Sequence, residues 1–148
     1  MLSPQLVTSV DLLPHFSKSI EVSIVFLEHL QHILLLKRSD EEEEAGTWGV
    51  PGGRGEDGET PLETALRELK EETSIQLNES QTIYHGHRFG RVQEIDFIIH
   101  LYQAKVEERP NVILNHEEHL AYVWTHISDF NSWPLIKTQK ALFDIVYR

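Results

Sequence analysis

The sequence predicts an α/β fold, in which a mixed β-sheet is sandwiched between helices. Three observations support this fold class. Apolar or β-branched runs that are typical of strands recur along the chain. Two segments show the spacing of amphipathic helices, one near the middle of the chain and one at its end. The strands and helices alternate without a repeat or a linker, so residues 1–148 are expected to form one domain with a peripheral segment at 1–17.

The first half of the chain predicts three strands. Residues 20–29 (IEVSIVFLEH) and 32–39 (HILLLKRS) are strand-like runs that two residues separate. The acidic run at 40–44 predicts a solvated loop. A short strand, WGVP at residues 48–51, follows this loop, and a proline and two glycines are expected to end it. A Gly-rich loop then leads to the central helix.

The central helix is predicted over residues 61–73. Thr60 has the properties of an N-cap, and Pro61 suits the first helical position. Glu63 stands three residues after Thr60 and completes a capping-box pattern. The side chains expected to dock the helix on the sheet are Leu62, Ala65, Leu66 and Leu69.

The second half predicts strands and a terminal helix. One strand is expected within residues 74–89, broken at 78–80, and another at 94–106, where apolar residues alternate. A last short strand is expected at 120–126 (LAYVWTH). Residues 133–148 predict a helix. Its expected buried stripe consists of Leu135, Ile136, Ala141, Leu142 and Ile145.

Composition excludes several classes of protein. The net charge of −11 argues against a protein that binds the phosphate backbone of a nucleic acid duplex. No run approaches the ~18 apolar residues that a membrane helix needs. The N-terminus lacks the basic region of a signal peptide, and the chain contains no cysteine for disulfides or thiolate metal sites. A cytoplasmic protein without a membrane partner is expected.

Three carboxylates at the end of the central helix stand in unfavourable positions. Glu68, Glu71 and Glu72 are helical neighbours, and each like-charged pair costs about 0.2–0.5 kcal/mol. The partial negative charge of the helix C-terminus adds to this cost. A hard divalent cation such as Mg²⁺ would turn the repulsion into coordination. A solvated acidic helix end remains an equally open interpretation of these residues alone.

The wider spacing resembles a known family motif. From Gly53 to Ile75 the chain reads GRGEDGETPLETALRELKEETSI, which resembles the Nudix box, G-x5-E-x7-R-E-U-x-E-E-x-G-U with U aliphatic. The departure is Ser74, where the family has glycine. The residues on the pattern are Gly53, Glu59, Arg67, Glu68, Leu69, Glu71, Glu72 and Ile75. The chain is therefore identified as a MutT-like member of the Nudix hydrolase superfamily, with the Nudix fold expected and no subfamily assigned.

The resemblance implies a reaction and a cofactor. Nudix hydrolases split the pyrophosphate bond of a nucleoside diphosphate linked to another group, with Mg²⁺ as cofactor and Mn²⁺ as a possible substitute. Such a reaction needs positioning and charge neutralisation more than covalent chemistry. The expected partner is a small nucleotide, and the protein itself is expected as a monomer or homodimer. A Nudix-like module that binds a nucleotide without hydrolysing it is the alternative.

The resemblance also assigns roles to the box residues. It implies that Glu68 and Glu72 are the main metal ligands. Glu71 is implied as a further ligand or a carboxylate that orients water. The backbone carbonyl of Gly52, just before the box, is implied to complete the coordination.

Three more residues receive roles. Arg67 and Glu59 resemble the family's structural pair, which holds the carboxylates in place by bidentate hydrogen bonds. Arg67 could instead be a simple helical partner of Glu63 or Glu71. In some family members a glutamate outside the box acts as general base or extra ligand, and Glu118 in the loop at 115–119 is the candidate here.

The substrate is narrowed only by elimination. Family members that act on ADP-ribose often carry a proline about fifteen residues past the box, and dinucleoside polyphosphate hydrolases often carry a tyrosine slightly further on. Residues 90–93 supply neither. A nucleoside triphosphate or a modified deoxynucleoside triphosphate is therefore expected, and the residues that bind it are not identified.

Overall fold

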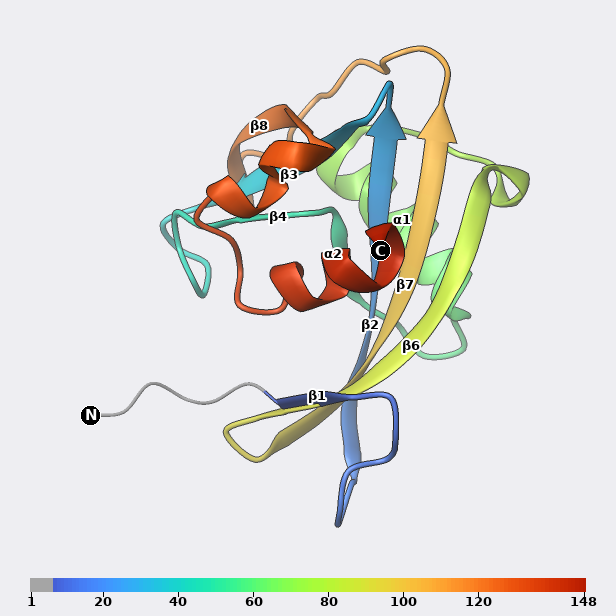
Figure 1. Ribbon diagram of the computed structural model, residues 1–148, viewed down its shortest axis with the longest axis vertical. Helices are drawn as coiled ribbons and strands as arrows, with labels where there is room; N and C mark the ends of the chain where they lie inside the picture. Colours follow the sequence, from blue (N-terminus) through green and yellow to red (C-terminus); the bar gives the residue numbers. More distant parts are fainter. Residues whose placement is uncertain (1–6) are drawn as a thin grey trace.

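The structure, a computed structural model, describes residues 7–148 (Figure 1). Within these residues an eight-stranded sheet carries two α-helices and two short 3₁₀ helices. The elements in chain order are β1 (Val7–Ser9), β2 (Lys18–His29), β3 (His32–Arg38), β4 (Trp48–Gly49), β5 (Gly52–Arg54), α1 (Pro61–Thr73), η1 (Glu79–Gln81), β6 (Thr82–Val92), β7 (Ile95–Val106), β8 (His119–His126), η2 (Ile127–Ser132) and α2 (Gln139–Tyr147).

The sheet is mixed. Its main order is β1-β6-β7-β2-β3-β4, while β5 pairs with β2 and β8 pairs with β3. The two long central strands, β2 and β7, run parallel, and the other neighbours are antiparallel. Because Ser23 of β2 lies opposite Gly53 of β5, the start of the loop before α1 is fixed on the sheet.

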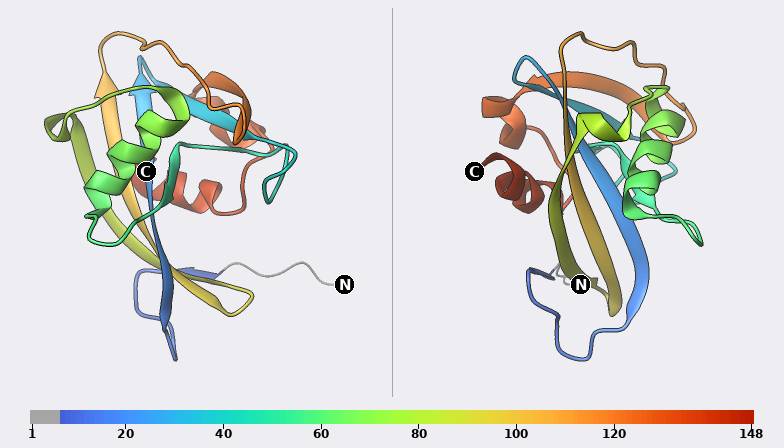
Figure 2. Two further views of the ribbon diagram at one scale, coloured as in Figure 1. Left: turned by 180° about the vertical axis from the view of Figure 1, so that it is seen from behind. Right: turned by 90° about the vertical axis from the view of Figure 1, so that its right-hand side faces the viewer.

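Helices cover both faces of the sheet, as predicted. Figure 2 shows α1 on one side of the long strands and α2 on the other. The α1 face buries Ala65 and Leu69 of the helix against the β2 side chains of Val25 and Leu27. The opposite face holds an aromatic cluster of Phe26, Phe130, Phe143 and Tyr147, in which the rings of Phe130 and Phe143 stack at 4.2 Å between centroids.

The prediction for the central helix is confirmed over its full length. Helix α1 spans Pro61–Thr73, with a capping box between Thr60 and Glu63. The N–H of Glu63 donates to Oγ1 of Thr60, and the N–H of Thr60 donates to Oε1 of Glu63, each over 3.1 Å. Ser74 ends the helix in the left-handed conformation, at φ 64°. The left-handed backbone of Ser74 sets the direction in which the chain leaves α1.

The predicted terminal helix at 133–148 is wrong at its start, because α2 begins only at Gln139. The preceding residues pair with β4 instead. The N–H of Trp48 donates to the carbonyl of Pro134 over 2.8 Å, and the N–H of Ile136 donates to the carbonyl of Trp48 over 2.9 Å. The predicted stripe is also wrong at Ala141, which is exposed, while Phe143 is buried.

Two strands were not expected from the sequence. Gly52–Arg54, predicted as loop, forms β5, because the backbone of β2 offers it an antiparallel partner. Val7–Ser9, inside the segment predicted as peripheral, forms β1 at the edge of the sheet beside β6. Residues 1–6 of that segment lie outside the described residues. Whether 1–148 is a single domain stays a prediction.

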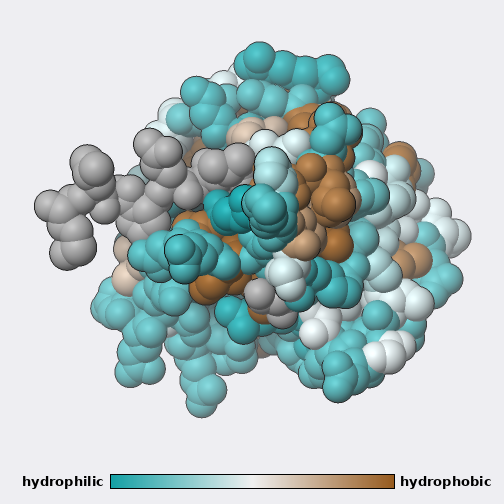
Figure 3. All heavy atoms as spheres, turned by 90° about the horizontal axis from the view of Figure 1, so that it is seen from below, coloured by the Kyte–Doolittle hydropathy of each residue, from teal (hydrophilic) through white to brown (hydrophobic). Residues whose placement is uncertain are grey.

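The end of the molecule near β1 exposes apolar side chains. Viewed from below, hydrophobic atoms reach the surface between hydrophilic ones (Figure 3). Val10, Leu12 and Ile95 are among the large apolar residues exposed in the structure. Neither α1 nor α2, nor any other helix of the described residues, has the length and apolar composition needed to cross a membrane.

Candidate active site

A polar pocket lies beside the second half of α1. Its volume is about 560 Å³, and it is formed by β5, α1, the acidic loop after β3 and the segment that enters β8. The residues that line it are Arg38, Glu41, Glu42, Glu43, Gly52, Gly53, Arg54, Glu68, Glu72, Glu118 and His119. Five of the predicted site residues therefore meet in one pocket: Gly52, Gly53, Glu68, Glu72 and Glu118.

Glu72 is the most enclosed carboxylate of this pocket. Glu72 is only 4% exposed, and its Oε1 accepts a hydrogen bond of 2.9 Å from the backbone N–H of Gly52. Burial raises the pKa of Glu72 well above its ordinary value, because the hydrogen bond from Gly52 offsets only part of the desolvation. The charges of Glu68 and Glu118 act in the same direction. The ionised form of Glu72 thus lacks a strong positive partner.

Glu118 and His119 complete a compact cluster with Glu72. One potential ligand atom from each of these residues lies within 4.8 Å of the other two. Burial raises the pKa of the Glu118 carboxyl, and burial lowers the pKa of His119 to about 4. His119 is therefore neutral at pH 7, and its lone pair can face a cation. The donor set of two carboxylates and one imidazole suits a divalent metal ion.

Glu68 lies on the same face of α1 as Glu72, and its carboxylate closely contacts Gly53. A Cβ atom on Gly53 would come within 2.4 Å of Cδ of Glu68. Since any larger side chain at position 53 would displace this carboxylate, the close approach explains why the box glycine is needed. Burial raises the pKa of Glu68, and its hydrogen bond with Arg67 opposes the shift.

Arg67 organises a second group of carboxylates outside this cluster. Its guanidinium makes a bidentate contact with Glu59, with distances of 2.7 Å (Nε–Oε2) and 3.1 Å (Nη2–Oε1). Nη1 donates to Glu68 over 2.9 Å and to Glu71 over 3.2 Å. Hydrogen bonding with Arg67 lowers the pKa of Glu59 to about 2. Arg67 therefore contacts both Glu59 and Glu71, two of the partners considered from the sequence, while Glu63 serves the capping box.

Glu71 is not brought into the buried cluster. Its side chain is 54% exposed, points to Arg67 and does not line the pocket. The role as further ligand that the family resemblance implies for Glu71 stays a prediction. The structure likewise does not test the implied carbonyl ligand of Gly52, whose N–H is the group seen in contact with Glu72.

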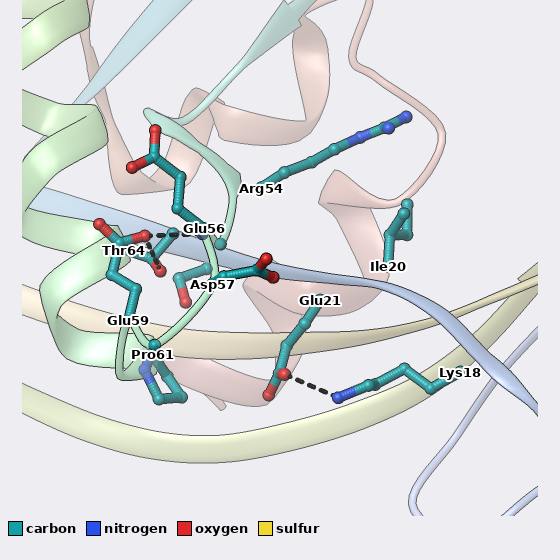
Figure 4. Close-up of a pocket in the computed structure, with 12 residues that line it drawn as sticks. Lys18, Ile20, Glu21, Arg54, Glu56, Asp57, Glu59, Pro61 and Thr64 are labelled. Atoms are coloured by element: carbon teal, nitrogen blue, oxygen red, sulfur yellow. Dashed lines mark hydrogen bonds and ion pairs between the residues drawn. The ribbon is translucent and has the colours of Figure 1, made fainter.

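A second pocket lies on the other side of the loop before α1. It has a volume of about 320 Å³, and Figure 4 shows the side chains around it. Lys18 is paired there with Glu21 over 3.2 Å, while the Arg54 side chain extends away from that pair. Arg54 lines both pockets and has no ion-pair partner among the described residues. It is a cation available to an anionic ligand.

Sequence reasoning missed part of the pocket. Arg38 and the acidic loop at 41–43 were interpreted as strand end and solvated loop, and they line the pocket in the structure. His119 is not among the site residues predicted from the sequence, although it follows Glu118 directly. Its register could have been found, because the strand pattern of residues 120–126 extends back by one residue and turns His119 toward the core.

Comparison with known proteins identifies relatives that match most of this chain in sequence. The sequence model of the NUDIX domain matches residues 18–144. A CTP pyrophosphohydrolase of Escherichia coli is 32% identical over 120 residues, covering 80% of this chain and 84% of the relative. The asymmetrical bis(5′-nucleosyl)-tetraphosphatase of the mouse is 31% identical over 133 residues, covering 80% of this chain and 85% of the relative.

Two further comparisons support the box region alone or the fold alone. A Nudix hydrolase fusion protein of Bifidobacterium longum is 50% identical over 44 residues, and the matched part spans only 9% of its length. The crystal structure of a MutT NUDIX hydrolase from Burkholderia pseudomallei superposes with a TM-score of 0.74 at 22% identity, covering 86% of this chain and 97% of that chain. At this identity the superposition shows a shared fold.

Proposed function

The chain belongs to the Nudix hydrolase family, and on that premise we propose that it is a Mg²⁺-dependent hydrolase of a nucleoside triphosphate or modified deoxynucleoside triphosphate. The family acts on acid anhydride bonds of pyrophosphate-containing compounds. Water attacks one phosphorus of the pyrophosphate, the P–O bond to the bridging oxygen breaks, and that oxygen leaves with the remaining phosphate. The proposal concerns which anhydride this chain selects and which residues act on it.

One observation carries the proposal: a carboxylate pocket and an apolar pocket share one loop. The acidic loop after β3 contributes Glu41–Glu43 to the polar pocket and Glu44 to an apolar pocket of about 240 Å³. Oε1 of Glu44 also accepts a hydrogen bond of 3.1 Å from the N–H of Lys137, which ties the loop to the segment before α2. A nucleotide has the matching parts, a polyanion at one end and a flat base at the other.

The polar pocket fits a divalent cation. Glu68, Glu72 and Glu118 gather negative charge, and burial raises the pKa of each carboxyl, because the positive charges of Arg67 and Arg38 offset only part of the desolvation. A polyanionic substrate could not approach such a pocket unless the sign of its charge were inverted. When bound, Mg²⁺ would neutralise the phosphate charge and make water a stronger nucleophile.

The proposed roles divide among the residues of the pocket. Glu68 and Glu72 would hold the cation, with the carbonyl of Gly52, and Glu71, which lies outside the pocket, would be the further ligand or the group that orients water. Glu118 accepts the proton of the attacking water at a carboxylate oxygen, for which its raised pKa is suited. Arg54 binds the phosphates from the side of β5.

Arg67 and Glu59 act by positioning. The bidentate contact with Glu59 fixes the guanidinium, and the same guanidinium holds Glu68 at its edge of the pocket. Since Gly53 leaves space for Glu68, the three residues together set the position of one proposed ligand. This is the structural-pair role that the family resemblance implies.

The apolar pocket is the proposed place for the base. It is lined by Ile20, Val22, Val92, Phe97 and Ile99 from the sheet and by Lys137 and Thr138 before α2. The relative from E. coli named for CTP supports a nucleoside triphosphate, whereas the mouse relative is named for a dinucleoside tetraphosphate. Residues 90–93 lack the tyrosine that often accompanies the second activity, so we favour the first.

The remaining expectations are part of the same proposal. The protein is proposed to be cytoplasmic, to act as a monomer or homodimer, and to bind no nucleic acid duplex. The last point is supported by the net charge of −11, since a duplex needs a basic surface.

A substrate screen tests the proposal. Nucleoside triphosphates, modified deoxynucleoside triphosphates, nucleotide sugars, ADP-ribose and dinucleoside tetraphosphates are each incubated with the protein and Mg²⁺, and released phosphate or pyrophosphate is measured after a phosphatase step. A triphosphate should have the highest kcat/KM. Preference for ADP-ribose or a dinucleotide would reject the substrate and keep the reaction class. Binding without turnover of any of them would favour the binding-module alternative.

A further inference from the structure

His119 is a buried imidazole that the proposed reaction does not yet use. Its side chain is 7% exposed, and Nδ1 has no hydrogen-bond partner among the described residues. Nε2 lies 3.7 Å from Oε2 of Glu72, beyond hydrogen-bond distance. Nε2, the nitrogen that faces Glu72, also makes no hydrogen bond among the described residues, and since buried polar groups are normally satisfied, its position needs an explanation.

An ion pair between His119 and Glu72 does not explain it. A charge-assisted hydrogen bond would bring the two atoms to about 2.7–2.9 Å. Two ligands of one ion are instead kept apart, because each stands about 2.0–2.2 Å from a metal between them. The separation of 3.7 Å and the shared 4.8 Å cluster with Glu118 agree with that second arrangement.

We propose that Nε2 of His119 supplies a nitrogen ligand to the cation that Glu72 holds beside Glu118, so that the site binds Mn²⁺ more tightly than Mg²⁺. The inference rests on the proposed function, because it concerns the same cation. Carboxylate oxygens alone suit Mg²⁺, which is a hard ion. Imidazole nitrogen suits transition-metal ions, and replacing one oxygen ligand by nitrogen therefore changes which ion is preferred.

The chain offers a matched control. His116 stands three residues before His119 in the same segment, and it is exposed and outside the cluster. His116 lies in the loop before β8 and His119 is the first residue of β8, and of the two only His119 belongs to the cluster with Glu72. A nitrogen signal that depends on His119 and not on His116 would therefore identify the ligand.

Pulsed electron paramagnetic resonance of the full chain with one equivalent of Mn²⁺ tests the inference without measuring activity. The wild-type complex should show ¹⁴N coupling to the ion, His116→Ala should keep it, and His119→Leu should lose it. Calorimetric titration should show Mn²⁺ affinity at least about tenfold weaker in His119→Leu, while the smaller Mg²⁺ affinity changes little.

A second measurement covers the case in which His119→Leu fails to fold. Wild-type protein labelled with ¹⁵N-histidine should replace the ¹⁴N coupling by the ¹⁵N pattern. Tightly bound Mn²⁺ without histidine coupling would overturn the inference, as would unchanged coupling in folded His119→Leu. If turnover with Mg²⁺ persists in that case, the proposed function stands and only the role of His119 is rejected. If neither metal binds and no diphosphate is hydrolysed, the proposed function fails first.

Discussion

Two clusters of carboxylates, one around Arg67 and one around Glu72, lie side by side, and their charges are balanced in opposite ways. Around Arg67, Glu59 and Glu71 share one guanidinium at distances between 2.7 and 3.2 Å. Around Glu72, the nearest positive candidate is His119, which burial keeps neutral by lowering its pKa to about 4. The first group is balanced within the protein, while the second needs a partner from outside.

The difference explains how one helix can carry so many acids. Glu68 lies between the groups, since it contacts Arg67 and also lines the polar pocket. In the sequence, Glu68, Glu71 and Glu72 look alike, because they are neighbours on one helix. Their burial in the structure differs: Glu71 is exposed and Glu72 is buried. Each carboxylate that Arg67 neutralises lowers the repulsion that the cluster at Glu72 must withstand. We therefore expect substitutions in the two groups to fail in different assays.

The largest effect is expected for Glu72→Gln. The amide oxygen can still accept the hydrogen bond from Gly52, but the charge for the cation is gone. Turnover should fall by about 10²-fold or more, as for other electrostatic contributions to catalysis. Metal-free stability, measured by urea unfolding with a chelator, should stay the same or rise, because a buried charge has been removed. A fully active variant would reject the ligand assignment.

A large loss of stability, by contrast, is expected for Arg67→Met. The substitution leaves Glu59, Glu68 and Glu71 without their shared donor. Urea unfolding should show a loss of about 1–3 kcal/mol, and activity should fall as well because Glu68 loses its support. Glu56→Gln is the control, since Glu56 is 69% exposed and 3.7 Å from Arg67, and its effect should stay within about 0.5 kcal/mol. Equal stability of both variants would contradict the organising role of Arg67.

A smaller effect concerns pH and Glu59. Its pKa is about 2 in the folded protein against an ordinary value of 4.5, so the folded state favours the ionised form. The stabilisation is complete above the unfolded pKa and is lost as the pH falls from about 4.5 to about 2. The stability difference between wild type and Glu59→Gln, from denaturant unfolding, should shrink over this window. If the stability difference between wild type and Glu59→Gln stayed constant over this pH range, the ion pair with Arg67 would not be its cause.

The smallest effect is expected for Ser74→Gly. The left-handed backbone at φ 64° suits glycine, so the substitution should stabilise the protein by about 1 kcal/mol with little change in Mg²⁺ dependence. Loss of the weak 3.4 Å hydrogen bond from Ser74 Oγ to the carbonyl of Ile113 reduces the gain slightly. Ser74→Ala keeps the strained left-handed backbone and serves as the control, with thermal unfolding as the measurement. Equal melting temperatures of Ser74→Gly and Ser74→Ala would show that the strain is negligible.

Local patterns predicted α1 and its ends, because the capping box and the helical spacing of apolar residues depend on residues close in sequence. They did not predict β5 or the late start of α2, since both depend on backbone partners far along the chain. The same limit applies to the site. The box spacing predicted Glu68 and Glu72 as site residues, whereas the neutral, buried state of His119 depends on the fold, which places the first residue of β8 next to Glu72 of α1.

The central claim is that the group around Glu72 needs an external cation and the group around Arg67 does not. Calorimetric titration of Mg²⁺ into metal-free protein tests it most directly, with wild type, Glu72→Gln and Glu56→Gln compared at one pH and ionic strength. The account predicts saturable binding in wild type and Glu56→Gln and its loss in Glu72→Gln. Binding of equal affinity in all three proteins, or its loss in Glu56→Gln alone, would contradict the account.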